Sequence, residues 1–315
     1  MKRPRISVLI HTLDEAGQIE ECLRSVEWAD EIFLLDSFST DGTAEIVRTK
    51  FPQVRLELRE SRGSAAQKNH GIDRLRNDWV LVVDADERVT PELRDEILST
   101  LADGPRFWAY SIARRNVVFD REVRFGLLGI DRVIRLFHRN HARYPNRRVH
   151  ADLVVDGPVG RLRAPFIHNY VQSFDHLAEK MDRYAYWAAA QLYMEGKRRT
   201  WFHIGFHPFW RLIREFIGLA GFMDGTRGLV IAGMHAYYTF VKYARLWEFQ
   251  RLAREGRPVP LPHFDDDPKL WECPWEKGRP EPAAVSSRAS ASDSPPANTD
   301  AQFDVGSPVP PSRSL

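Results

Sequence analysis

The chain has 315 residues, 43% of them hydrophobic, and a formal net charge of +2. This length can bury the core of one large domain or two small ones, and the near-neutral charge argues neither for nor against nucleic acid. Two distant cysteines, Cys22 and Cys273, exclude a disulfide framework or a cysteine metal site and fit a reducing compartment.

No targeting or membrane-spanning segment is expected. The apolar run Ile6–Ile10 is too short for the core of a signal peptide. No stretch approaches the roughly 18 uninterrupted apolar residues of a spanning helix. We therefore expect a cytoplasmic protein.

The first hundred residues alternate between expected strands and helices. Strands are expected at Ile6–Ile10, Glu31–Asp36, Val54–Leu58 and Val80–Val83. Helices are expected from Asp14 or Glu15 to Val26, at Ala44–Lys50 and Ala65–Leu75, and from Pro91 with Thr90 as its cap. This alternation predicts right-handed βαβ units and a mostly parallel, nucleotide-binding type of sheet. A G-x-G-x-x-G loop and a P-loop are missing, which counts against dinucleotide oxidoreductases and P-loop kinases.

Two carboxylates, Asp84 and Asp86, follow the apolar strand in the sequence WVLVVDADER. Ligands of open parallel sheets bind at the carboxyl ends of strands. Strand alternation predicts that both acids point the same way, with Ala85 pointing away. Such a pair suits magnesium or manganese bound together with substrate phosphates. The plainer interpretation is a strand end whose acids face solvent.

The middle third is rich in arginine. Ten arginines lie from Arg114 to Arg148, opposed only by Asp120, Glu122 and Asp131. They suggest an electropositive floor for a diphosphate or an anionic acceptor, although for most of them an ion-paired surface is the plainer interpretation. Short strands are expected at Val133–Phe137, Val149–His150, Leu153–Val155 and Ile167–His168.

From Ser173 the pattern becomes helical, and it divides the rest of the chain. Trp201–Leu219 and Gly228–Trp247 combine aromatic and basic residues, which is typical of helices in a membrane interface or of helices packed on a core. We expect a catalytic domain over residues 1–170, a helical extension over 171–255, a strap over 256–282 and a disordered tail over 283–315.

Four motifs resemble, in order, those of the nucleotide-sugar domain of family 2 glycosyltransferases, inverting enzymes with the GT-A fold. They are Thr12–Glu15, Asp36–Thr43, Gln67–Gly71 and Asp84–Asp86. The chain is most similar to the lipopolysaccharide core β-1,4-glucosyltransferase branch. That likeness continues through Arg135–Phe137, Val149–His150, Ile167–His168 and Gly221–Gly228. The resemblance implies a GT-A type α/β fold with a helical C-terminal extension.

The resemblance also implies a donor site. Its members are Thr12, Glu15, Asp36, Lys68 and Asp84. Asp36 would accept hydrogen bonds from uracil or ribose, and Lys68 would approach the nucleotide or its phosphates, unless it is an ordinary exposed lysine. Ser37 stands where the family commonly has a second Asp, so base selectivity stays open. For Asp41 and Gly42 we expect a structural role in the turn.

A divalent cation, manganese or magnesium, is implied at the same place. The resemblance assigns it to Asp86, supported by Asp84 and completed by His168. An imidazole ligand favours manganese. The alternative for His168 is a structural histidine.

The implied reaction is displacement of the diphosphate by an acceptor hydroxyl, with a carboxylate removing the proton. Relatives often carry Glu directly after the Val-His pair, whereas this chain has Ala151 followed by Asp152. Asp152 is therefore the first candidate for the base and Asp131 the second. Either acid is alternatively an ion-pair partner of neighbouring arginines.

The expected activity is transfer of a hexose, glucose first, from a UDP-linked donor to a lipopolysaccharide-core or lipid-linked acceptor. No nucleic-acid partner is expected, and the protein would contact the cytoplasmic face of the inner membrane peripherally. One alternative is a sugar-nucleotide pyrophosphorylase, although HTLDEAGQ lacks the basic, Gly-rich loop of those enzymes. The other is a non-catalytic glycan- or membrane-binding relative, which Ala151 leaves open.

Overall fold

The computed structural model describes residues 3–61, 63–145, 152–198 and 201–262. The expectations for Val149–His150, for Ala151, for the strap beyond residue 262 and for the tail over 283–315 lie outside the described residues.

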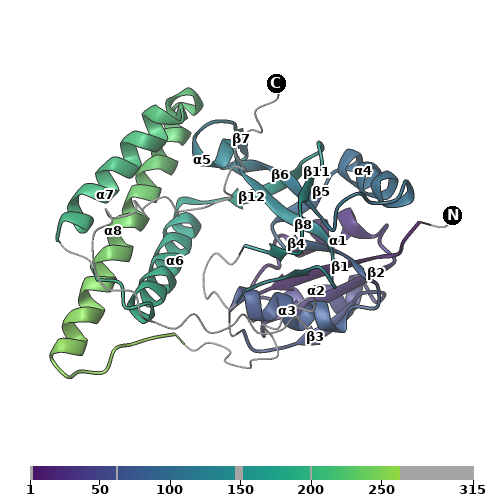
Figure 1. Cartoon of the computed structure of the whole chain (residues 1–315), viewed down its shortest axis with the longest axis horizontal. Helices are drawn as coiled ribbons and strands as arrows, with labels where there is room; N and C mark the ends of the chain where they lie inside the picture. The colour runs from purple at the N-terminus through teal and green to yellow at the C-terminus, as the bar shows by residue number, and fades with distance from the viewer. Residues whose placement is uncertain (1–2, 62, 146–151, 199–200, 263–315) are drawn as a thin grey trace, which may run out of the picture.

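The first half of the central sheet is parallel, as predicted. Its strands run in the order β3-β2-β1-β4 (Figure 1). Their bounds are β1 Ile6–Thr12, β2 Glu31–Asp36, β3 Arg55–Leu58 and β4 Trp79–Asp84. The central strands β1 and β4 are apolar and buried on both faces, which is why they read as continuous hydrophobic runs.

Helices cover both faces of this parallel half. The helices are α1 Ile19–Val26, α2 Thr43–Lys50, α3 Ser64–Arg74 and α4 Pro91–Ala102. Helices α1, α2 and α4 share one hydrophobic core with the sheet, and α3 belongs to a second core. The predicted cap is present, because Thr90 Oγ1 accepts a hydrogen bond from Leu93 N at 3.2 Å.

The predicted start of the first helix was wrong. Helix α1 begins at Ile19, whereas Asp14 has a positive φ of 55°. The carboxylate of Asp14 accepts a hydrogen bond from Thr40 N at 2.7 Å. The segment before α1 is therefore a loop joined to the loop after β2.

The second half of the sheet adds antiparallel pairs to the parallel ones. Strand β8 is antiparallel to β4, β6 is antiparallel to β8, and β12 is parallel to β6. The bounds here are β5 Glu87–Val89, β6 Ala109–Val118, β7 Arg121–Val123, β8 Arg132–His138, β9 Ala142–Arg143, β10 Val154–Val155, β11 Val159–Arg161, β12 Phe166–Val171 and α5 Gly126–Gly129. Strand β6 was not predicted, because Arg114, Arg115 and Asn116 interrupt its apolar pattern.

The described residues from Phe174 to Arg254 are mostly helical, as the pattern after Ser173 predicted. The helices are α6 Phe174–Met194, α7 Trp201–Ile213, the π-helix η1 Arg214–Gly218, the 3-10 turn η2 Gly221–Asp224 and α8 Thr226–Arg254. Helix α8 contacts both α6 and α7, with α7 at the outer edge of the molecule (Figure 1). None of the helices in the described part of the chain has both the length and the apolar character of a membrane span.

Candidate nucleotide and metal site

Three parallel strands end at one edge of the sheet and bring the expected donor residues together. Thr12 on β1 is the register partner of Asp36 on β2, and His11 is the partner of Asp84 on β4. Asp36 is fully buried and accepts a hydrogen bond from Ser39 N at 2.9 Å. Among the described residues, the buried Thr12 Oγ1 has no hydrogen-bond partner.

Hydrogen bonds join the loop after β1 to the loop after β2. Asp41 Oδ1 accepts a hydrogen bond from Thr43 N at 3.0 Å, and its Oδ2 accepts one from Ala16 N at 2.8 Å. Gly42 has a φ of 95°, a conformation that favours glycine. This geometry agrees with the structural role expected for Asp41 and Gly42.

Asp84 is surrounded by cationic side chains. Its Oδ1 lies 3.4 Å from Lys68 Nζ, and its Oδ2 contacts Arg135 Nη2. Burial alone would raise the pKa of Asp84, but Arg135, Lys68 and His11 outweigh burial and hold the pKa well below its usual range. Asp84 is therefore ionised and turned toward these cations.

Behind Asp84 lies a buried ion-pair network. Arg135 Nη2 is 3.1 Å from Glu87 Oε1, and Arg114 Nη1 is 3.5 Å from the same oxygen. Arg114 Nε also contacts Asp131 Oδ2 at 2.6 Å, and Asp131 is only 2% exposed. This burial and pairing support the ion-pair interpretation of Asp131 over its role as the base.

Asp86 lies in a turn after β4, and its carboxylate contacts different side chains from those that contact Asp84. Strand β4 ends at Asp84, so the alternation of side chains along the strand does not extend to Asp86. Its Oδ2 lies 3.2 Å from His168 Nε2 and 3.7 Å from Lys180 Nζ. Burial would raise the pKa of Asp86, but His168 and Lys180 lower it far below its usual range.

Asn116 fixes the proton of His168. Asn116 Nδ2 donates to Leu128 O at 2.7 Å and lies 3.3 Å from Asp131 Oδ2, so its Oδ1 is the acceptor that faces His168 Nδ1 at 2.5 Å. The Nδ1 atom therefore carries a proton. The lone pair of a neutral His168 would then face the Asp86 carboxylate, an arrangement that requires a proton or a cation between Nε2 and Oδ2.

This pair fits a divalent cation better than the predicted trio does. In the described part of the chain no group of three His, Cys, Asp or Glu side chains is arranged to hold a metal. Asp86 and His168 adjoin, whereas Asp84 turns to Arg135 and Lys68. One oxygen and one nitrogen donor suit manganese or magnesium that takes its other ligands from a diphosphate and water.

Lys68 and Glu15 border the same site. Burial lowers the pKa of Lys68, and the nearby Asp84 partly offsets this effect. Burial, followed by the negative charge of Asp86, raises the pKa of Glu15 to about 7. The neighbouring Asn69 joins α3 to the segment after β9, because its Nδ2 donates to Tyr144 O at 2.9 Å and its Oδ1 accepts from Tyr144 N at 3.1 Å.

Asp152 is exposed just before β10. The preceding Val-His pair and Ala151 lie outside the described residues. The role of Asp152 as the base therefore stays a prediction.

Most arginines of the middle third have structural partners. The ion pairs are Arg114 with Asp131, Arg115 and Arg124 with Glu122, Arg139 with Asp78, and Arg143 with Asp73. Arg132 donates to two backbone carbonyls, and Arg135 contacts Asp84. The ion-paired interpretation fits most of these arginines, and Arg135 belongs to the candidate site.

Sequence reasoning missed four site residues: His11, Glu87, Asn116 and Lys180. Lys180 offered a signal, because it stands among the apolar core positions Leu177 and Met181 of α6. A lysine within an apolar stripe needs a buried partner. The other three have no signal of their own, because the side chains that they face are distant in sequence, as Arg135 is from Glu87.

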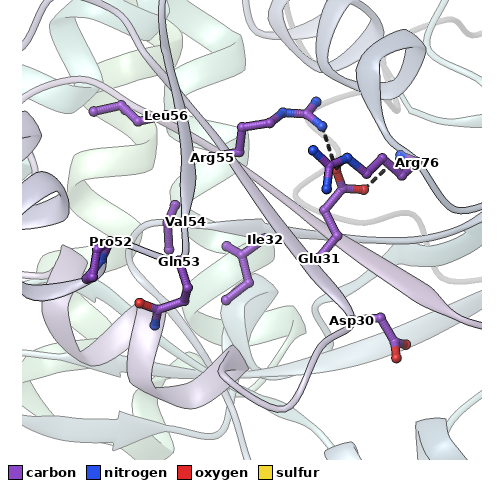
Figure 2. Close-up of a pocket in the computed structure, with 9 residues that line it drawn as sticks. All are labelled: Asp30, Glu31, Ile32, Pro52, Gln53, Val54, Arg55, Leu56 and Arg76. Carbon is purple, nitrogen blue, oxygen red and sulfur yellow. Dashed lines mark hydrogen bonds and ion pairs between the residues drawn. The ribbon is translucent and has the colours of Figure 1, made fainter.

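A surface hollow of about 480 Å³ lies away from this site (Figure 2). It is lined by Asp30 and Glu31, at the opposite end of β2 from Asp36. Glu31 in the hollow pairs with Arg55 at 2.6 Å and Arg76 at 3.7 Å. We assign it no part in the chemistry.

Comparison with known proteins gives a family match. Residues 7–153 match the model of glycosyl transferase family 2. The lipopolysaccharide core biosynthesis glycosyltransferase LpsC of Rhizobium meliloti is 29% identical over 258 residues, which cover 80% of this chain and 95% of LpsC. An uncharacterized glycosyltransferase of Rickettsia typhi is 27% identical over 263 residues, covering 79% of this chain and 89% of its own.

Solved structures are also similar. Staphylococcus aureus TarS 1–349 in complex with UDP-GlcNAc is 15% identical with a TM-score of 0.43, covering 81% of this chain and 93% of that one. Mannosyltransferase PcManGT from Pyrobaculum calidifontis, in complex with GDP-Man and Mn²⁺, is 17% identical with a TM-score of 0.43. That match covers 78% of this chain and 88% of PcManGT.

Proposed function

We propose that the chain, whose residues 7–153 match glycosyl transferase family 2, moves a hexose from a UDP-linked donor to a lipopolysaccharide-core or lipid-linked glycan, with inversion at the anomeric carbon. The observation that carries this proposal is the edge where β1, β2 and β4 end. There Thr12 is in register with Asp36, and the adjacent His11 is in register with Asp84, close to the Asp86–His168 pair.

The donor nucleotide would bind at the ends of β1 and β2. The unpartnered Thr12 Oγ1 and the buried Asp36 carboxylate offer hydrogen bonds to the base or ribose. Glu15, on the loop after β1, would border the same part of the nucleotide site. Lys68 would approach the phosphates from α3, a role that its buried position beside Asp84 supports.

The diphosphate would lie beside Asp86 and His168, which would hold manganese or magnesium. When bound, such a cation stabilises the negative charge that builds on the leaving diphosphate. The side chains of this chain do the rest. Asp84 is held ionised by Arg135 and Lys68, and Asn116 keeps the proton on His168 Nδ1 so that Nε2 remains available as a donor atom.

The acceptor hydroxyl would attack from the face opposite the diphosphate and invert the anomeric carbon. We assign removal of its proton to Asp152 before Asp131, because Asp152 is exposed and Asp131 is buried in an ion pair with Arg114.

The acceptor class rests on the relative LpsC, whose name states lipopolysaccharide core biosynthesis. Glucose is the first sugar to test. Such acceptors are lipid-borne, so we propose that the protein works at the cytoplasmic face of the inner membrane in peripheral contact with it.

Release of UDP from UDP-glucose in the presence of manganese tests the donor half without a known acceptor. We expect slow UDP release by the wild-type chain and more than about a hundredfold weaker manganese-dependent UDP binding by Asp86→Asn, because the change removes a ligand charge. The exposed Asp103→Asn is the matched control. Unaltered binding by Asp86→Asn would remove the metal role from Asp86.

A further inference from the structure

Exposed hydrophobic side chains are concentrated on the C-terminal helices. Twelve of the nineteen large hydrophobic side chains that the described residues expose lie from Trp201 to Trp247. We name as the hairpin face the exposed aromatic side chains on one side of α7, which are Phe202, Phe206, Phe209 and Trp210. Exposed apolar side chains grouped in this way mark an interaction site.

The face follows one side of α7. Its residues Phe202, Phe206, Phe209 and Trp210 recur every three or four positions, so they share one side of the helix. They are between 45% and 60% exposed. Helix α7 lies at the outer edge of the molecule, with α8 between it and α6 (Figure 1).

The charges around the face identify its partner as anionic. Residues 197–247 contain eight Lys and Arg but only two carboxylates, Glu215 and Asp224. Glu215 is buried against His235, and Asp224 accepts a hydrogen bond from Phe125 N at 2.8 Å. Both acids are thus used inside the protein, as are Arg211, which pairs with Glu215, and Arg245, which pairs with Asp182, whereas Arg214 is exposed on the stretch that joins α7 to η2.

The dimensions favour a helix that lies in a membrane interface over one that crosses the membrane. Helix α7 has 13 residues and is about 20 Å long, shorter than the roughly 30 Å hydrocarbon core. The opposite side of the hairpin is buried, because α8 packs on both α6 and α7. An aromatic face with basic neighbours is the pattern of an interfacial helix.

We propose that the hairpin face docks on an anionic lipid bilayer, with Phe209 and Trp210 entering the headgroup boundary and Arg214 meeting lipid phosphates. This deepens the proposed function, on which it rests for the lipid-borne acceptor. Lys180 of α6 contacts Asp86, and α6 packs against α8, so α6 and α8 connect the docked face to the candidate site.

Co-sedimentation with vesicles of phosphatidylethanolamine and phosphatidylglycerol tests the proposal on the full chain. We expect wild type to bind these vesicles, to bind pure phosphatidylcholine far less, and to lose binding in 0.5 M salt as charges are screened. The double variant Phe209→Gln with Trp210→Gln should bind at least about tenfold more weakly, since two apolar groups no longer enter the lipid. The matched control, Leu58→Gln with Trp108→Gln, removes two exposed apolar side chains elsewhere and should bind normally.

Two outcomes would overturn the proposal. One is equal binding by the Phe209/Trp210 variant and its control. The other is a wild-type dimer that ignores vesicles and that the Phe209/Trp210 variant breaks, because the face would then join two copies of the chain. UDP release from UDP-glucose separates this proposal from the function: vesicle binding that fails while UDP release persists removes only the docking surface.

Discussion

Asp84 and Asp86 each lie beside basic side chains, and the pairings differ in kind. Asp84 is neutralised by Arg135 and Lys68, which belong to the protein. Asp86 faces His168, whose Nδ1 proton is already committed to Asn116. This difference makes Asp86 the carboxylate with coordination capacity left for an added cation.

The role of Asn116 can be tested as a positioning residue. Replacing it by Ala frees the His168 ring to rotate or to exchange its proton, so manganese affinity should fall about tenfold to a hundredfold. Calorimetric titration with manganese and UDP measures the loss. In a His168→Ala background the same change should add nothing, whereas additive losses would mean that Asn116 acts independently of His168.

The two candidate bases should respond differently to amide substitution. Asp152→Asn should lower turnover by roughly 10² to 10⁴ while donor affinity stays nearly unchanged, because only proton removal is lost. Asp131→Asn should instead reduce the free energy of unfolding by about 3 kcal/mol, since Arg114 would lose its buried partner. Steady-state kinetics with urea unfolding separates these effects, and normal turnover of Asp152→Asn would assign the base elsewhere.

The helical extension is anchored to the catalytic domain through a buried charge cluster. Glu215 in η1 is 2% exposed and lies 2.8 Å from His235 Nδ1 and 3.5 Å from Arg211 Nε. The same segment meets α5, because Gly126 N donates to Leu219 O at 2.9 Å. The π-helical turn thus places the Glu215 carboxylate where the C-terminal helices meet the sheet.

The contribution of Glu215 to the free energy of unfolding should depend on pH. Burial would raise the pKa of Glu215, but His235 and Arg211 outweigh it, so the pKa lies below the ordinary 4.5. A lowered pKa means that the carboxylate stabilises the fold above pH 4.5 and that this contribution is lost as pH falls through the folded-state value. Glu215→Gln should therefore cost about 3 kcal/mol at pH 7 and less at pH 4, measured by urea unfolding.

The exposed Glu248→Gln on the same extension is the matched control. It should change the free energy of unfolding by no more than about 0.5 kcal/mol at either pH. An equal cost of Glu215→Gln at both pH values would mean that packing, not charge, makes the cluster stabilising.

The net charge of the whole chain is close to zero, but basic and acidic residues are unevenly distributed along it. The net charge of +2 includes a segment, residues 197–247, in which bases outnumber acids by eight to two. It carries the exposed aromatic side chains of the hairpin face, which are remote in sequence from the acidic strand ends that form the candidate site. The two faces serve the two partners that we propose, a membrane and a soluble nucleotide sugar.

The end of the chain should contribute nothing to stability. Residues 283–315 are rich in Pro, Ser, Ala and Asp and have few apolar side chains to bury. Deleting them should leave Tm, measured by differential scanning calorimetry, unchanged at the same protein concentration. A clear decrease in Tm would show that this segment packs on the folded part.

Local patterns predicted much of the fold. Apolar runs predicted β1, β2 and β4, and the residues Asp41 and Gly42 predicted a turn, because both signals arise from neighbours in the chain. Local patterns did not predict strand β6. Its polar residues Arg114 and Asn116 have their partners on other segments, which a pattern of neighbouring residues does not report.

The sequence by itself determined the resemblance of its first half to glycosyl transferase family 2, the parallel half of the sheet and the edge where the acids gather. Only the tertiary structure decided that Asp84 turns to Arg135, that Asp86 meets His168 and that Asn116 fixes the histidine proton. The physical reason is that a strand pattern reports which way a side chain leaves its own backbone. Which charge compensates a buried group depends on segments brought beside it by folding, because burial without a partner costs too much free energy.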